Sequence, residues 1–204
     1  MLHIHILQTI AGAHYDQGHY AKAATVYETC ANLLETKEQF RDAAAMMCLV
    51  GTSFHCLEDM DGAVKWFQKA RKLGEENGFY SAECGACLGL GRVALKQGRT
   101  QEAEELFRVS LSTLDFVEDN VPSFPLTVLA RSVNLAFARL LLTTERFEDA
   151  GPSVQRLREL SEEEPDPKNA IHFDARLLAV EFHLKRGDRG EADKEVEVPP
   201  PCTP

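Results

Sequence analysis

The sequence predicts an all-α protein, built as a solenoid of antiparallel helix pairs. An alanine-centred segment recurs every 40 residues, and small and aromatic residues stand at fixed offsets from that alanine. The composition agrees, because aromatic residues are only 8% of the 204 residues while small residues are abundant. A chain of this length can bury a sizeable core without disulfides or metals. We therefore interpret the repeat as the organising feature of the fold.

Three strong copies of the repeat share one pattern. Each central alanine has an aromatic ring four residues later and a small residue twelve residues earlier. The alanines are Ala23, Ala63 and Ala103, the rings Tyr27, Phe67 and Phe107, and the small residues Ala11, Gly51 and Gly91. Small residues on two consecutive helices let an antiparallel pair approach closely. The ring lies one turn along the same helix face and fills the gap to the neighbouring pair.

The helix pairs follow from this register. We predict helices at 2–17 with 20–36, 39–57 with 60–77, 79–97 with 100–116, 124–143 with 147–163, and 167–186 with a stub at 188–197. Glycines such as Gly18, Gly98 and Gly187 end the first helices of three pairs. Pro122 and Pro125 predict a loop over 119–125, which lengthens the third spacing to 47 residues. The fourth copy and the partial fifth, centred on Ala150 and Ala192, are the most divergent.

This arrangement of small and aromatic residues resembles the tetratricopeptide repeat family over nearly the whole chain. The 40-residue period and the missing closing proline are similar to the extended variant of Pins-type scaffolds and kinesin light chains. The resemblance implies one right-handed superhelical domain over residues 1–197. Its repeats would span about 4–37, 44–77, 84–117 and 131–164, with a partial repeat at 173–197 and a disordered proline-rich tail at 198–204.

The resemblance also implies a concave wall lined by the first helix of each pair. The residues it places there as candidate peptide contacts are Gln8, Tyr15, Thr52, His55, Leu88, Arg92, Lys96, Leu135 and Arg139. We expect Arg92, Lys96 and Arg139 to lie without acidic neighbours, beside leucines that include Leu95 and Leu142. Such a wall suits a peptide with acidic and apolar side chains, with the two arginines as anchors. Alternatively, the arginines merely extend over the leucines and solvate the wall.

Composition and motifs argue against other functions. Lys and Arg total 22 against 32 Asp and Glu, a net charge of −10, which disfavours general binding to nucleic acid or anionic membranes. No nucleotide loop, nucleophile elbow or zinc signature is present, so we expect no catalysis, cofactor or metal. The Cys84-Gly85-Ala86-Cys87 segment matches a redox motif in letters, but no strand precedes it, and helix packing is favoured.

The predicted function is that of a non-catalytic protein–protein interaction scaffold, which holds an acidic and apolar peptide or helix in its concave groove. Without a leader or an apolar run of about 18 residues, the chain is expected to be cytoplasmic. The alternative is a structural segment of a larger scaffold, which associates with itself through its exposed final helix pair. Leu177 and Leu184 would carry that contact.

Overall fold

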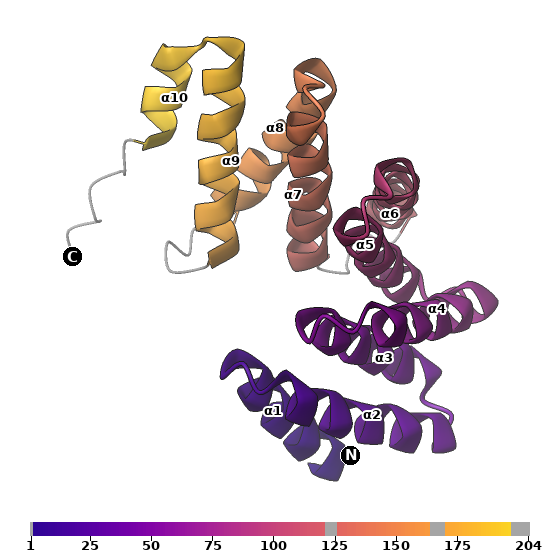
Figure 1. The fold of residues 1–204 in the computed structure, drawn as a ribbon. Helices are drawn as coiled ribbons and strands as arrows, with labels where there is room; N and C mark the ends of the chain where they lie inside the picture. The colour runs from indigo at the N-terminus through magenta and orange to yellow at the C-terminus, as the bar shows by residue number, and fades with distance from the viewer. Residues whose placement is uncertain (1, 121–125, 164–169, 197–204) are drawn as a thin grey trace. The chain divides into compact units, whose positions relative to one another are not determined.

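The computed structural model describes residues 2–120, 126–163 and 170–196 (Figure 1). This part of the chain forms ten α-helices and no strands. The helices are α1 (Leu2–Asp16), α2 (Tyr20–Thr36), α3 (Phe40–Cys56), α4 (Met60–Asn77), α5 (Tyr80–Lys96), α6 (Thr100–Asn120), α7 (Thr127–Thr143), α8 (Phe147–Glu163), α9 (Ala170–Arg186) and α10 (Arg189–Val196). The predicted all-α class of helix pairs is confirmed, and most boundaries fall within one residue of the prediction. None of the described helices is long and apolar enough to cross a membrane.

The structure corrects the prediction between the third and fourth pairs. Helix α6 continues to Asn120, so the first two residues of the predicted 119–125 loop are helical. The helix period persists because Leu114 and Val117 are both buried, and no proline precedes Pro122. Helix α7 begins at Thr127 instead of residue 124. The remaining loop residues 121–125 and the predicted tail at 198–204 lie outside the described residues.

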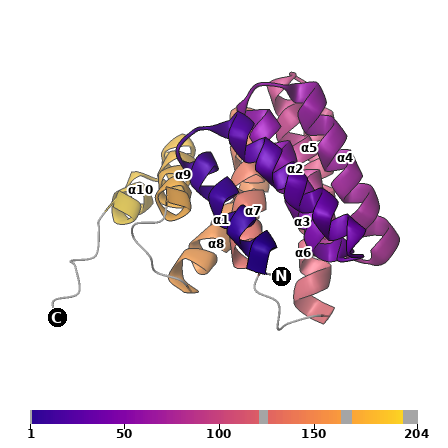
Figure 2. The same cartoon turned by 90° about the horizontal axis from the view of Figure 1, so that it is seen from below.

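The helices divide into two compact units, residues 1–126 and 127–204. In the first unit each helix from α1 to α6 packs on the next, and α3 also packs on α5. In the second unit each helix from α7 to α10 packs on the next, and α7 also packs on α9. Figures 1 and 2 show the three helix pairs of the first unit stacked in chain order. Within the first unit α3 and α5 are therefore neighbours, and within the second unit α7 and α9 are, as a wall of first helices requires.

The repeat residues form the core of both units. The alanines at the centres of the five copies are buried, and so are the three repeat rings. A Cβ atom added to Gly51 or Gly89 would lie 2.8 or 2.3 Å from the Phe67 ring, so this ring lies against the backbone of both glycines. At Gly91 the added Cβ would lie 2.4 Å from Phe107. The small residues of the repeat thus provide the space that its rings fill.

Turns between helices pass through the left-handed backbone region. Gly18, Gly98 and Gly187 adopt it between the helices of a pair, with φ of 75°, 75° and 81°. Glu58 and Glu145 occupy equivalent turns with φ of 63° and 59°. Every residue except glycine is sterically strained in this region, because its Cβ approaches the following carbonyl oxygen. These two turns therefore place a carboxylate where a glycine would fold more easily.

Candidate peptide-binding surface

Four of the predicted contact residues converge at the C-terminal ends of α1, α3 and α5 in the first unit. They are Tyr15 from α1, His55 from α3, and Arg92 and Lys96 from α5. The 40-residue period explains the convergence, because Tyr15 and His55 occupy equivalent positions of consecutive repeats. Together with Cys56 we call these residues the basic surface. Cations are favourable at these helix ends, where the last carbonyl groups carry partial negative charge.

Tyr15 connects α1 to α3 at this surface. Its hydroxyl lies 3.3 Å from the Cys56 thiol, a hydrogen bond in which either group can donate. The Tyr15 ring meets Tyr20 edge to face, with ring centroids 5.2 Å apart. Burial and the hydrogen bond to Cys56 raise the pKa of Tyr15, while the charge of Arg92 opposes this shift. Tyr15 therefore stays protonated and retains a hydroxyl hydrogen that can be donated.

His55 on α3 is half-buried and interacts electrostatically with the two cations of α5. Burial lowers the pKa of His55, and the positive charges of Lys96 and Arg92 lower it further. A charged imidazole is disfavoured in this position because it would be desolvated beside like charges. His55 is thus mostly a neutral polar group of the basic surface near neutral pH.

The expectation that the cations lack acidic neighbours is wrong for Lys96 and Arg139. Lys96 Nζ donates to Glu58 Oε1 at 2.9 Å, and this bond lowers the pKa of Glu58. In the second unit Arg139 Nη2 lies 3.4 Å from Asp174 Oδ1. Each carboxylate comes from a different segment of the chain, the α3–α4 turn or α9, so neither pairing follows from adjacency in sequence.

The two predicted neutral contacts have intramolecular partners. Gln8 on α1 donates through Nε2 to the Met46 sulfur on α3 at 3.4 Å. The Thr52 hydroxyl donates to the Cys48 carbonyl of its own helix at 2.8 Å. Gln8 therefore bridges neighbouring first helices, while Thr52 keeps only its acceptor capacity for a ligand.

Two of the predicted leucine contacts belong to the protein core. Leu88 on α5 is 5% exposed and Leu135 on α7 is 6% exposed. Leu142, which was expected beside the arginines, is also buried. These side chains present little surface to a ligand, so the candidate surface rests mainly on its aromatic and cationic members. Leu95 on α5 is half-buried and remains the apolar neighbour of the basic surface.

The Cys84–Cys87 segment lies inside α5 and is buried. The Cys84 sulfur lies 3.0 Å from the Ser110 hydroxyl of α6, which itself donates to the Cys84 carbonyl at 2.9 Å. Burial raises the pKa of Cys84 to about 12 and that of Cys87 to about 11. A thiol with so high a pKa is a poor nucleophile at neutral pH. These contacts support the interpretation of the segment as helix packing, and no metal-binding group of three or more ligands occurs among the described residues.

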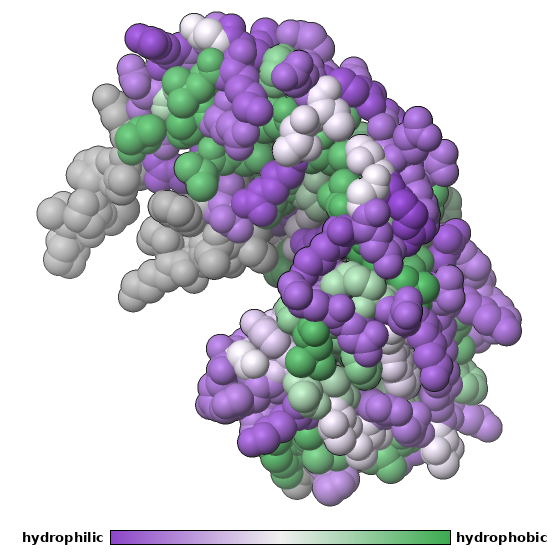
Figure 3. Space-filling model, viewed as in Figure 1, coloured by the Kyte–Doolittle hydropathy of each residue, from purple (hydrophilic) through white to green (hydrophobic). Residues whose placement is uncertain are grey.

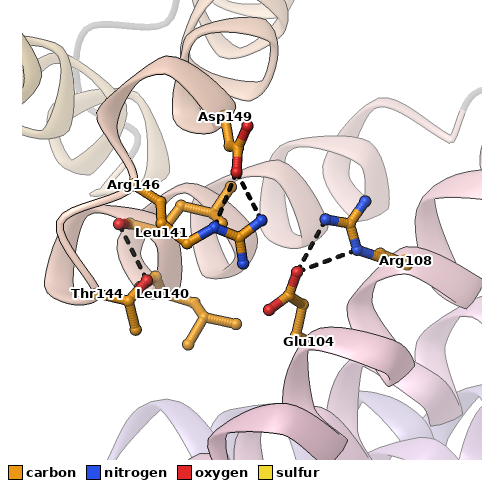
Figure 4. A network of polar contacts seen from close by, with 7 residues as sticks. All are labelled: Glu104, Arg108, Leu140, Leu141, Thr144, Arg146 and Asp149. Atoms are coloured by element: carbon orange, nitrogen blue, oxygen red, sulfur yellow. Dashed lines mark hydrogen bonds and ion pairs between the residues drawn. The ribbon is translucent and has the colours of Figure 1, made fainter.

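The second unit has a buried cation that sequence reasoning did not single out. Arg131 on α7 is 2% exposed and donates through Nη2 to the Leu160 carbonyl in the last turn of α8. Nearer the other end of this pair, Arg146 Nη2 lies 2.6 Å from Asp149 in the first turn of α8 (Figure 4). A capped helix C-terminus and a carboxylate in a first turn are both favoured by the helix dipole. Arg131 therefore joins α7 to the end of α8, whereas the Arg146–Asp149 pair is a local contact at the start of α8.

The comparisons with known proteins agree with the repeat geometry. Residues 86–116, which include most of α5 and α6, match the sequence profile of the tetratricopeptide repeat. This segment resembles a tetratricopeptide repeat. A search of curated proteins gave no match.

Solved structures show the same fold at low sequence identity. BtubC (BKLC) from P. vanneervenii has a TM-score of 0.71 at 16% identity, over 93% of this chain and 75% of that one. The nearly identical TPR-like repeats of a Podosopora anserina protein, assigned as a kinesin light chain, have a TM-score of 0.64 at 12% identity, over 95% and 91%. The Rap conjugation gene regulator of plasmid pLS20, in complex with the Phr* peptide, has a TM-score of 0.53 at 17% identity, over 95% and 57%.

Proposed function

We propose that this helical repeat protein is a non-catalytic interaction scaffold, whose first unit binds an acidic, partly apolar peptide or helix on the basic surface. The observation that carries the proposal is the convergence of Tyr15, His55, Arg92 and Lys96 from three helices. The pLS20 regulator, which was solved with a peptide, supports the use of this fold for peptide binding. We place the protein in the cytoplasm, with no nucleic acid or membrane as partner.

The chemistry of the basic surface favours carboxylates. The Arg92 guanidinium is planar and can bind a carboxylate through two parallel hydrogen bonds, whereas Lys96 acts as a compact point charge. The Tyr15 hydroxyl can donate a further hydrogen bond, and its ring with Leu95 offers apolar contact. Because the chain as a whole carries a net charge of −10, an acidic ligand is repelled elsewhere and attracted here. Binding should therefore weaken as salt screens these charges.

A random-peptide display selection on the purified chain tests this proposal. We expect selected peptides to be enriched in Asp or Glu next to apolar residues. Binding of these peptides should be lost in the double variant Arg92→Glu, Lys96→Glu. The matched control is Lys65→Glu, Lys72→Glu, which makes the same change of charge at exposed positions of α4. Selected peptides without acidic residues, or equal loss in both double variants, would refute the assignment to the basic surface.

Self-association through the final helix pair is a second candidate function, favoured by exposed apolar side chains. Leu177 and Leu184, seven residues apart on one face of α9, are 53% and 52% exposed, and Val196 on α10 is 62% exposed. Figure 3 shows hydrophobic atoms gathered over α9 and α10. Exposed apolar patches on soluble proteins commonly mark contact sites.

Sedimentation velocity over a range of concentrations tests self-association. If the α9 face forms the contact, the sedimentation coefficient rises with concentration in the wild type and stays constant in Leu177→Glu, Leu184→Glu. Val128→Glu is the control, because Val128 on α7 of the same unit is 60% exposed but lies on another helix. A wild type that remains monomeric at all concentrations would refute this candidate.

A further inference from the structure

Cations at the candidate groove positions are paired with carboxylates of the chain itself. Lys96 lies 2.9 Å from Glu58, and Arg139 lies 3.4 Å from Asp174. Both pairs join residues of different segments, so they are not simple contacts along one helix. In each unit, a cation of the predicted wall therefore already contacts the chemical group that an acidic ligand would offer.

The Glu58 carboxylate reaches Lys96 from an unusual backbone position. Glu58 lies in the α3–α4 turn with φ of 63°, where the turns 40 residues before and after it have Gly18 and Gly98. The steric cost of this conformation shows that the turn itself does not favour a glutamate here. What the side chain adds is its ion pair with the end of α5.

Both pairs are exposed enough for a ligand to replace one partner. The side chains of Lys96 and Glu58 are 44% and 77% exposed, and those of Arg139 and Asp174 are 50% and 42% exposed. Ion pairs in contact with solvent are weak, because water and salt compensate for their loss. A carboxylate that approaches from a bound peptide can thus exchange with the internal one without the cost of opening the core.

We infer that Glu58 is an internal competitor, whose carboxylate holds in the unliganded chain the position that an acidic side chain of a bound peptide takes at Lys96. This inference rests on the proposed function. It implies that the groove discriminates against neutral peptides, which cannot replace the internal carboxylate. It also implies that affinity for acidic peptides is held below the value that the cations alone would give.

Fluorescence anisotropy with a defined probe tests the competition. The probe is a fluorescein-labelled peptide of alternating glutamate and leucine, and its glutamine–leucine counterpart is the uncharged control. We expect Glu58→Gln to tighten binding of the acidic peptide by about 1.5- to 5-fold, which corresponds to the roughly 0.2–1 kcal/mol of an exposed ion pair. Binding of the glutamine–leucine peptide should not change in Glu58→Gln. Glutamine at position 58 removes the charge while it keeps the steric cost of the turn.

Glu76→Gln is the matched control for net charge. It removes one carboxylate from an exposed ion pair on the outer helix α4, where Lys72 Nζ lies 3.8 Å from Glu76 Oε1. Equal tightening by Glu76→Gln and Glu58→Gln would overturn the inference, because net charge alone would then explain the gain. Binding of the acidic peptide with no response to Glu58→Gln would overturn it too, while the proposed function would stand. Absence of binding in every variant would overturn both.

Lysine acetylation with mass spectrometry gives a readout that needs no peptide. If Glu58 holds Lys96, acetylation of Lys96 should be faster in Glu58→Gln than in the wild type, while Lys65 on α4 reacts at the same rate in both. An unchanged acetylation rate of Lys96 would show that Glu58 does not form this ion pair in solution. That result alone would refute the inference.

Discussion

The close packing of Phe67 against two glycines makes Gly89→Ala a sharp test of the core. A Cβ atom at residue 89 would lie 2.3 Å from two atoms of the Phe67 ring, far inside the contact distance of about 3.5–4.0 Å. The ring is 2% exposed and cannot move into solvent, and a Cβ at Gly51 would also lie 2.8 Å from its Cδ1 and Cε1 atoms. Alanine therefore forces either the ring or the α5 backbone to shift.

Two opposing effects decide the sign of the stability change. Replacing a helix-interior glycine by alanine stabilises a helix by about 1 kcal/mol. Overpacking of a filled core costs about 1–3 kcal/mol. Because this contact is so short, we expect overpacking to dominate and Gly89→Ala to lower the free energy of unfolding by about 1–2 kcal/mol. Urea denaturation followed by far-UV circular dichroism measures the change.

Gly85→Ala is the control within the same helix. A Cβ atom at residue 85 meets only the Cys48 sulfur at 3.7 Å, an ordinary contact, so this variant should be stabilised by up to about 1 kcal/mol. Phe67→Leu should rescue part of the loss in Gly89→Ala, because leucine leaves room for the new methyl group. Equal stabilisation by the two alanine variants would refute the packing of Phe67 against Gly89.

Three further predictions concern a turn, a thiol and a histidine. Glu145→Gly should stabilise the chain by about 1 kcal/mol in urea denaturation, because glycine removes the steric cost at φ of 59°; a less stable variant would contradict this. Cys87, whose pKa burial raises to about 11, should react with Ellman's reagent only after urea unfolds the chain, and rapid reaction in the native state would contradict its burial. The pKa of His55 in the folded chain lies below its ordinary value of 6.5. At pH values near and just below 6.5, the unfolded chain therefore binds more protons than the folded chain. Stability should therefore fall as pH is lowered from about 8 to about 5. His55→Gln should reduce that fall, and identical pH profiles of urea midpoints would contradict the assignment.

The backbone of this protein could be predicted from the sequence because the signals for it are local and repeated. A small residue, an alanine and a ring at fixed offsets specify which helix faces meet, and the pattern recurs at Ala23, Ala63 and Ala103. The same offsets locate the turns to within a residue or so. The prediction was least accurate at the end of α6. The prolines of the next segment suggested that this helix ends at residue 116, but its apolar period continues through Val117 and the helix extends to Asn120.

The leucines of the wall show why helix periodicity alone could not define the site. Leu88 occupies the repeat position that Gln8 has in the first copy, and Gln8 contacts Met46 of the next first helix. That position thus lies between neighbouring first helices, where an apolar side chain becomes part of the core. A position assigned to a wall by its register is therefore available to a ligand only if the neighbouring repeat leaves it uncovered.

The charges of the wall depend on contacts that periodicity does not encode. Glu58 and Lys96 are 38 residues apart and belong to a turn and a helix end, so no helical spacing relates them. The only sequence signal was a glutamate in the place of Gly18 and Gly98, and its meaning depends on which residue the turn faces in three dimensions. Repeats conserve the backbone on which side chains are placed, whereas ligand recognition depends on how side chains of adjacent repeats meet. For this reason the fold could be inferred from one strong pattern, while the electrostatics of the basic surface required the arrangement of several helices.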